Sequence, residues 1–402
     1  MNSTNNFSDK KIVVAGLGGV GGFLGAALAS TYPNVIFFAR GARKEALGSN
    51  GLTLKSEFIG DRHVTPALVT DQVSEIGTAD FLIISVKNYS LEQICKQLAP
   101  IVDNHTIIVP VLNGIDPADR TRQTFGKGNG VVVDSLIYII SSSEPDFSIV
   151  QKGDYATLRI GTKSNDAAVK TAVQSVHDIF SPTGVTCIME DDIEAAIWKK
   201  YIFNCAFNIM TAAYSASVGD LRARPEHVED MGNLIDEACL IAHKKQVNIP
   251  DDFKEERIRF FLNLQSPTGT SSMRRDVDAG RPTELETFSG YLLQEAPKYG
   301  VELPRTRYYY DLLKKKIEET KSGSELNQLL HNLQLSQEKG GSSQEETATC
   351  HYQLGLYYIN HGNAMEAMNH LGDALYIRRK YYPEESLRIR EIYYALEQCT
   401  FM

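Results

Sequence analysis

A glycine-rich turn near the start of the sequence constrains the fold more than any other feature. Residues Gly16–Gly21 match the GxGxxG pattern, with the apolar run Ile12–Ala15 before them and the apolar run Phe23–Leu28 after them. A tight turn from a strand into a helix directs backbone N–H groups and the positive end of a helix dipole at a pyrophosphate. The pattern therefore predicts a dinucleotide site, and a glycine-rich turn without a ligand is the alternative. The residues assigned to this site are Gly16, Gly18, Gly19, Val20 and Gly21.

The region that follows the turn is typical of the α/β class. Short apolar runs alternate with helical segments from Lys11 to about Ile188, which indicates βαβ units and a mostly parallel sheet. We therefore expect a Rossmann-type domain over residues 1–190. Its expected strands are Lys11–Ala15, Val35–Ala39, Phe81–Val86, Thr106–Pro110 and Val131–Ile140.

The pattern becomes helical beyond about Asp191. Ile193–Tyr214 is long and largely apolar, so we expect a helix that is buried on most of its surface. Further along, from Lys321 to Glu346, the residues are mostly Ser, Gly, Gln, Glu and Lys, which is typical of a linker. The predicted parts are an all-helical domain over 191–320, a linker over 321–346 with a short helix at Leu326–Leu335, and a helical appendage over 347–402.

Composition and charge exclude several classes of function. The formal net charge of −9 argues against nucleic acid as the main partner. The six cysteines form no CxxC pair and the nine histidines form no HExxH motif, so we predict a reducing compartment and no metal site. The first ten residues are polar, and no apolar run reaches the ~18 residues of a membrane span. We therefore expect a cytoplasmic protein without a membrane partner.

The end of the second expected strand bears on the choice of dinucleotide. Arg40 and Arg43 occur where many NAD-binding proteins place a carboxylate that holds the ribose 2′-hydroxyl. Because guanidinium groups suit bidentate binding of phosphate, these arginines predict a 2′-phosphate and hence NADPH. Two solvated surface arginines are the alternative.

A polar stripe interrupts the long apolar helix. Lys200, Asn204 and Asn208 are spaced at i, i+4 and i+8, so they lie on one helix face. Buried amides and a buried ammonium group need hydrogen-bonding partners, and a small polar substrate would supply them. A lysine in such a place has a lowered pKa and suits proton donation. The alternative is a solvated Lys200 with asparagines that cap loops, and Lys199 is expected on the surface.

Several motifs follow one another in the order and spacing of a known family. After the glycine-rich turn come Ala39–Gly41, Ser85–Lys87, Leu112–Gly114, the W-x-K-x-x-x-N-x-x-x-N helix, Ser271–Asp276 and Gly280–Glu284. Together they resemble the ketopantoate reductases (2-dehydropantoate 2-reductases) over residues 11 to about 316. The resemblance implies NADPH-dependent reduction of 2-dehydropantoate, a small 2-keto acid, to pantoate on the route to coenzyme A.

The resemblance also implies roles for single residues. Lys200 would donate a proton to the substrate carbonyl oxygen, and Glu284 would hold the substrate hydroxyl. Asparagines and a serine would bind the substrate, and a lysine would lie beside the nicotinamide. The residues in these binding roles are Asn204, Asn208, Ser272 and Asn113 for the substrate, and Lys87 and Asn113 for the cofactor.

Local structural explanations remain for some of these positions. Glu284 stands at a predicted helix start, where the dipole favours a carboxylate, and Ser272 lies where hydroxyls cap helices. Asn113 precedes a glycine and suits a turn. Val218 departs from the family, many members of which carry Asn there. A reductase of another 2-keto or 3-hydroxy acid, or an NADPH-binding module without catalysis, is therefore the alternative function.

The carboxyl-terminal residues have a separate pattern. Their aromatic, leucine and small residues follow tetratricopeptide-like spacing, although one helix pair of this kind cannot bury its apolar face alone. We expect residues 347–402 to dock on the chain itself, on a second copy in a homodimer or on another protein. An unrelated amphipathic hairpin is the alternative. The residues of the pattern are Leu354, Gly355, Tyr358, Gly362, Ala367, Leu371, Ala374 and Pro383.

Overall fold

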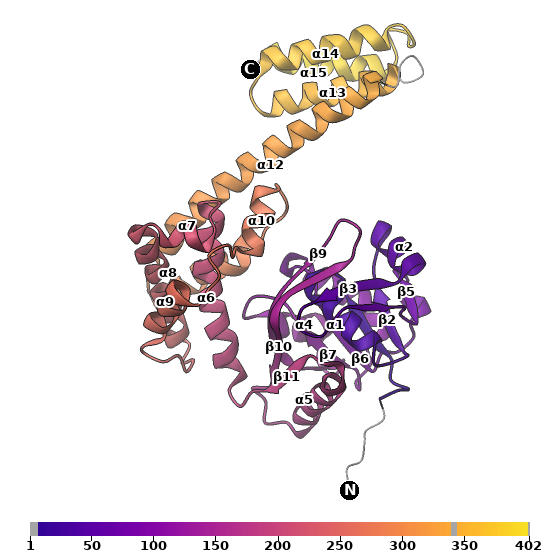
Figure 1. Ribbon diagram of the computed structural model, residues 1–402. Helices are drawn as coiled ribbons and strands as arrows, with labels where there is room; N and C mark the ends of the chain where they lie inside the picture. The colour runs from indigo at the N-terminus through magenta and orange to yellow at the C-terminus, as the bar shows by residue number, and fades with distance from the viewer. Residues whose placement is uncertain (1–6, 339–343, 401–402) are drawn as a thin grey trace. The chain divides into compact units, whose positions relative to one another are not determined.

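The computed structural model describes residues 7–338 and 344–400 of the chain (Figure 1). The chain forms two compact units. The first consists of Met1–Thr211, Ala216–Thr270 and Glu284–Tyr310. The second consists of Ala212–Ser215, Ser271–Thr283 and Asp311–Met402. The four-part division made from the sequence stays a prediction, since two helices run from one unit into the other.

The first unit contains the expected Rossmann-type sheet. Within the described residues it is six-stranded, in the order β5-β2-β1-β6-β7-β8, and every neighbouring pair is parallel. Strands β1, β2 and β6 are buried throughout, as their uninterrupted apolar runs require when both faces of a sheet are covered. The bounds are β1 Ile12–Ala15, β2 Val35–Phe38, β5 Leu68–Thr70, β6 Phe81–Ile84, β7 Ile107–Pro110 and β8 Val131–Val132.

Alternate residues of β1 belong to different cores. Ile12 and Val14 pack with side chains of α1 and α5, whereas Val13 and Ala15 pack with side chains of α3 and α4. This separation follows from the two-residue period of a strand. Helices therefore cover both faces of this part of the sheet. The helices are α1 Gly19–Ala29, α2 Gly41–Asn50, α3 Leu91–Leu98, α4 Pro117–Phe125 and α5 Ala167–Phe180.

A second sheet joins the α1 side of this core, and the sequence did not predict it. It is five-stranded within the described residues, and β9 and β10 form a long antiparallel pair in it. The expected single strand over Val131–Ile140 is wrong, because that stretch divides into β8 and β9. Polar side chains such as Gln151, which is buried, obscure the apolar alternation of β10. The bounds are β3 Leu52–Ser56, β4 Arg62–Val64, β9 Asp134–Ser143, β10 Ile149–Gly161 and β11 Thr186–Met189.

The predicted long helix is present as α6, Ile193–Ala213. Ile202, Ala206 and Met210 on it are fully buried. The Tyr201 hydroxyl donates hydrogen bonds to the carbonyl oxygens of Thr287 and Phe288, and so ties α6 to a π-helical turn at Glu286–Gly290. The remaining helices of the first unit include α7 Val218–Arg222, α8 Pro225–Lys244, α9 Phe253–Asn263 and α11 Tyr291–Glu295.

The second unit is helical, and its longest helix runs through most of the predicted linker. Residues 321–338 continue helix α12, Pro304–Glu338, so the helix expected at Leu326–Leu335 is present as part of a much longer one. Residues 339–343 of that predicted linker lie outside the described residues. Lys, Glu, Gln and Leu favour helix, and the Tyr357 hydroxyl donates a hydrogen bond to the Ser322 carbonyl at 3.0 Å, which supports the helix at its Ser-Gly-Ser stretch.

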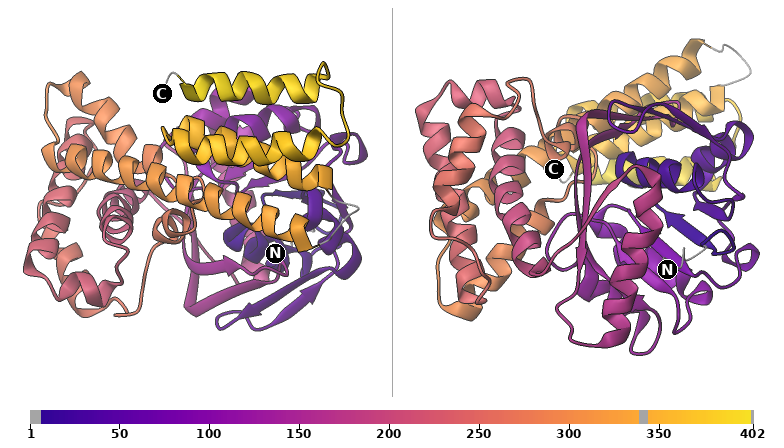
Figure 2. Two further views of the ribbon diagram at one scale, coloured as in Figure 1. Left: turned by 90° about the horizontal axis from the view of Figure 1, so that it is seen from above. Right: turned by 60° about the horizontal axis from the view of Figure 1, so that its bottom comes forward.

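Within the described residues the appendage contains three helices, where the sequence pattern suggested one helix pair. Helices α13 Gln344–Asn360, α14 Ala364–Arg378 and α15 Leu387–Thr400 lie side by side (Figure 2). Residues from α14 and α15 form its core, and Leu354 of α13 is fully buried as well. The tetratricopeptide-like interpretation stays a prediction. Among the helices of the described residues, none is long and apolar enough to cross a membrane.

Candidate active site

The glycine-rich turn forms an open backbone cradle between β1 and α1. Gly16 has a φ of +91°, and a Cβ at this position would lie 2.4 Å from the Ser85 carbonyl oxygen. A Cβ on Gly21 would lie 1.9 Å from the Gly16 carbonyl oxygen, so both positions require glycine. Gly18 is the N-cap residue of α1, and no side chain caps the helix there. A Cβ on Gly18 would have no atom within 4 Å, so the space in front of the helix is open. The first-turn N–H groups can therefore receive a phosphate, which fits a dinucleotide.

The two arginines of the predicted phosphate site differ in their surroundings. Arg40 is exposed and is the N-cap residue of α2. Arg43 is half-buried, donates hydrogen bonds to the Leu17 carbonyl and to the Ser143 hydroxyl at 3.1 Å, and stacks on Phe147 at 4.7 Å. Burial lowers the pKa of the Arg43 guanidinium. Arg43 thus braces the glycine-rich turn, while Arg40 presents its charge to solvent beside it.

The predicted catalytic lysine and glutamate lie in one polar cluster of the first unit. The Lys200 ammonium donates a hydrogen bond to Asn113 Oδ1 at 3.3 Å. Asn113 Nδ2 donates in turn to Glu284 Oε2, also at 3.3 Å. Lys87 Nζ is 4.0 Å from the same carboxylate oxygen. Asn113 follows β7 and Lys87 follows β6, so the carboxyl ends of two adjacent strands face the helix-borne lysine.

Glu284 is the centre of this cluster. Its side chain is 6% exposed, and a buried carboxylate requires charged or hydrogen-bonding partners. Besides Asn113 and Lys87, the backbone N–H of Asn88 donates to it at 3.3 Å. Its position is therefore determined by partners from two strand ends. The capping role suggested as an alternative does not account for these long-range contacts.

The surroundings of Lys200 lower the pKa of its ammonium group. Desolvation lowers the pKa of its ammonium group from 10.5 to about 8, and the Glu284 carboxylate opposes part of that change. The ring of Tyr138 on β9 lies 5.9 Å from Lys200 Nζ, and burial raises the pKa of the tyrosine hydroxyl. An ammonium group with a pKa near 8 can release a proton close to neutral pH. The cluster thus combines a proton donor with a carboxylate that accepts hydrogen bonds.

Asn88 is a positioning residue that the sequence interpretation missed. Its Nδ2 donates to the Asn113 carbonyl at 2.6 Å, and Arg120 donates to the Asn88 carbonyl at 3.0 Å. Arg120 also donates to Glu92 at 2.7 and 2.8 Å. These contacts hold the loop that carries Asn113. The sequence signal that could have pointed to Asn88 is its position directly after Lys87, just beyond the expected strand Phe81–Val86.

The other predicted substrate residues lie on two helices and belong to different units. Asn208 is buried, and its side chain donates to the carbonyl of half-buried Asn204 at 3.1 Å, so it satisfies part of its polarity within α6. Ser272 belongs to the second unit, where it opens α10, Ser272–Asp278, directly after the N-cap Ser271. Val218 is fully buried at the start of α7. The substrate roles of Asn204, Asn208 and Ser272 stay predictions.

Two family models cover most of the chain. Residues 12–165 match the model described as "Ketopantoate reductase PanE/ApbA", and residues 192–317 match its counterpart for the carboxyl-terminal domain. The chain is 29% identical over 294 residues to the uncharacterized oxidoreductase YkpB of Bacillus subtilis, covering 73% of this chain and 94% of that protein. It is 24% identical over 310 residues to the 2-dehydropantoate 2-reductase of Nostoc sp., covering 76% and 95%.

Solved structures show the same fold over the same part of the chain. A ketopantoate reductase from Ralstonia eutropha superposes with a TM-score of 0.69 at 23% identity, covering 78% of this chain and 99% of its own. A D-mandelate dehydrogenase bound to NADH and anilino(oxo)acetate has a TM-score of 0.69 at 18% identity, covering 77% and 99%. The fold and the relatives together place the chain in a class of oxidoreductases that bind a nicotinamide cofactor. The chain belongs to the ketopantoate reductase family.

Proposed function

We propose that this protein reduces 2-dehydropantoate to pantoate with NADPH, a step toward pantothenate and coenzyme A. The observation that carries the proposal is the connected series Lys200–Asn113–Glu284 at the carboxyl ends of the strands. Such edges bind ligands in open α/β sheets. Relatives described as 2-dehydropantoate 2-reductases support the substrate class.

The residues of the cluster divide the chemistry between them. A bound reduced nicotinamide supplies a hydride to the substrate carbonyl carbon. Lys200 donates a proton to the carbonyl oxygen as negative charge develops there, and its lowered pKa makes that transfer easier. Glu284 accepts a hydrogen bond from the substrate hydroxyl and orients it. Asn113 accepts a hydrogen bond from the ammonium and donates one to the carboxylate, and so links the two groups.

The preference for NADPH rests on the strand end after β2. Arg40 offers an exposed guanidinium beside the cradle, and Arg43 adds positive charge behind it. A nearby carboxylate would repel a 2′-phosphate, and Gly41 and Ala42 between the arginines carry no charge. The mandelate dehydrogenase neighbour was solved with NADH, so the choice of cofactor is a direct test of these two side chains.

A second candidate is the reduction of another small 2-keto acid. Val218 stands where many family members carry Asn, and a buried valine offers no hydrogen bond to a substrate. The D-mandelate dehydrogenase neighbour carries an aromatic ligand on a similar fold. A module that binds NADPH without catalysis would need groups for the phosphates but neither Lys200 nor Glu284. The presence of both residues therefore favours a reductase.

Steady-state oxidation of NADPH against a panel of 2-keto acids tests the proposal. The panel includes 2-dehydropantoate, 2-oxoisovalerate, pyruvate and phenylglyoxylate. We expect the highest kcat/KM with 2-dehydropantoate. A higher value with phenylglyoxylate would favour the second candidate, and no turnover with any 2-keto acid while NADPH still binds would overturn both.

A further inference from the structure

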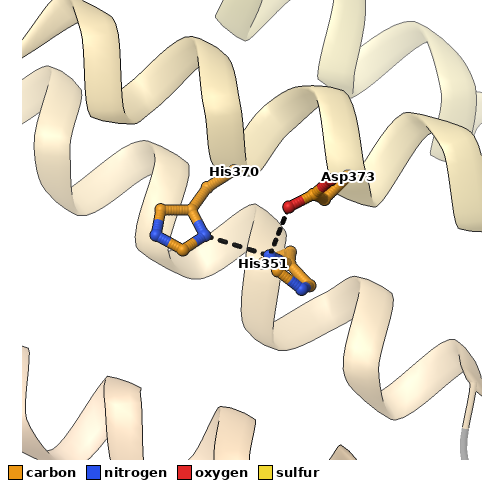
Figure 3. A group of neighbouring side chains, drawn as sticks. All are labelled: His351, His370 and Asp373. Atoms are coloured by element: carbon orange, nitrogen blue, oxygen red, sulfur yellow. Dashed lines mark hydrogen bonds and ion pairs between the residues drawn. The ribbon is translucent and has the colours of Figure 1, made fainter.

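Two histidines and an aspartate meet between neighbouring helices of the second unit. His351 lies on α13, and His370 and Asp373 lie on α14 (Figure 3). His351 Nδ1 is 3.0 Å from His370 Nδ1 and 3.6 Å from Asp373 Oδ2. The three potential ligand atoms all lie within 4.8 Å of one another. The residues converge on one point although 19 positions separate the two histidines.

Close packing of the two helices brings these side chains together. Gly355 lies one turn beyond His351, and a Cβ there would lie 2.6 Å from the side chain of Leu371. Ala367, one turn before His370, is fully buried. Because small residues occupy both helices at the contact, the backbones approach closely enough for the imidazoles to meet. His370 and Asp373 share one face of α14, since they are three positions apart.

The surroundings hold the ligand atoms in place and leave a route from solvent. The ring of Tyr358 lies parallel to that of His370, with centroids 5.6 Å apart and planes 6° apart. The His351 side chain is 10% exposed, whereas that of Asp373 is 64% exposed. The imidazoles are therefore restrained by packing, and the carboxylate stands on the solvent side, where an ion would enter.

Two imidazole nitrogens and one carboxylate oxygen suit a zinc ion. Zinc–ligand distances of about 2.0–2.2 Å in tetrahedral geometry place neighbouring ligand atoms roughly 3.3 Å apart. The observed separations of 3.0 and 3.6 Å lie on either side of that value. We propose that His351, His370 and Asp373 bind one zinc ion, with water as the fourth ligand, and that this ion links α13 to α14. The alternative is an N–H···N hydrogen bond between the imidazoles.

Calorimetric titration of the full-length protein with zinc chloride, after removal of metals by a chelator, tests the site. We expect one zinc ion per chain. Loss of a group that only hydrogen-bonds to a metal ligand costs about 10–100-fold in affinity, so removing a ligand itself should cost at least about tenfold. Asp373→Asn keeps the size of a largely exposed side chain, so its folding should be unaffected. His370→Gln should weaken binding further, because it removes a more basic ligand.

Matched controls separate this site from other zinc ligands. Cys350→Ser changes the thiol next to His351, and His331→Gln changes an exposed histidine of α12 in the same unit. Both should bind zinc as the unmodified protein does. Cobalt chloride gives a second readout, because tetrahedral cobalt absorbs visible light, and the band should be lost with His370→Gln.

Circular dichroism decides whether each variant is folded. If His370→Gln loses helix, Asp373→Asn carries the test. Zinc binding that is unchanged in Asp373→Asn and in a folded His370→Gln would overturn the proposal. So would the absence of a zinc-binding signal in the unmodified protein, and the histidines would then form the hydrogen-bonded pair.

Discussion

Glu284 and Asp373 are carboxylates beside basic side chains, one in each unit, and their surroundings differ. Glu284 is 6% exposed and is approached by groups from two strand ends, whereas Asp373 is 64% exposed and shares its helix with one of the histidines. A buried carboxylate needs nearly complete pairing, so the chain around it is closely constrained. An exposed carboxylate requires no such network. We therefore expect changes around Glu284 to affect catalysis strongly, and changes around Asp373 to affect local binding.

The largest expected effect is the loss of kcat when a residue of the buried cluster around Glu284 is changed. Lys200→Ala should lower kcat by about 10²–10⁴-fold, because it removes the proton donor of the transition state. NADPH binding should stay near normal, as measured by fluorescence titration. Lys199→Ala is the matched control and should retain kcat. A Lys200→Ala variant with most of its kcat would remove the lysine from the mechanism.

A smaller effect, on cofactor binding, should distinguish the exposed Arg40 from Arg43, which hydrogen-bonds to the glycine-rich turn. Arg40→Ala should weaken NADPH binding by roughly ten- to a hundredfold and NADH binding far less, since a charged hydrogen bond contributes about 1.5–3 kcal/mol. Arg43→Ala should weaken both cofactors, because Arg43 also holds the Leu17 carbonyl and Ser143. Binding constants for both cofactors measure this. Equal losses in Arg40→Ala would contradict its assignment to the 2′-phosphate.

The protonation of Lys200 predicts a pH dependence. The lysine acts as a proton donor, so kcat should be constant below a pH of about 8 and fall by about tenfold per unit above it. Burial lowers this pKa and Glu284 raises it, so Glu284→Gln should move the inflection to lower pH. Initial rates at saturating substrate across the pH range measure the shift. An inflection that moves upward in this variant would contradict the electrostatic coupling.

The smallest expected effect comes from removing the appendage. The second family model ends at residue 317, and the residues assigned to chemistry all precede it. A protein ending at Ser322 should therefore keep its cofactor preference and kcat/KM within about twofold. It should lose any association made through residues 347–402, which light scattering measures as a change in mass. Loss of reduction by a folded, truncated protein would mean that the appendage completes the active site.

The sequence predicted those features that a short stretch of chain determines. The glycine-rich turn and most core strands depend on neighbours within a few residues, and so does the helix that carries Lys200. Glu284 and Asn113 were found through the family pattern. The structure adds their hydrogen bond, because no local pattern relates residues 171 positions apart.

The second sheet and the extension of α12 depended on contacts that periodicity does not reveal. Gln151 is buried in β10, where it pairs with the Ser56 hydroxyl at 2.6 Å, so a strand residue that looks exposed in the sequence is internal. Ser322–Ser324 suggested a linker, yet they are helical, and Tyr357 of α13 contacts Ser322 there. In both places tertiary contacts outweigh weak local preferences.

By itself the sequence determined the class of fold, the cradle for a dinucleotide and the stripe that bears Lys200, because each depends on residue types at fixed local spacing. Tertiary structure alone decided the burial that lowers the pKa of Lys200 and the support of Asn113 by Asn88. It also decided the meeting of His351 with His370, where the sequence predicted no metal site. Desolvation and convergence of distant side chains arise from packing, which follows from the folded arrangement of the whole unit.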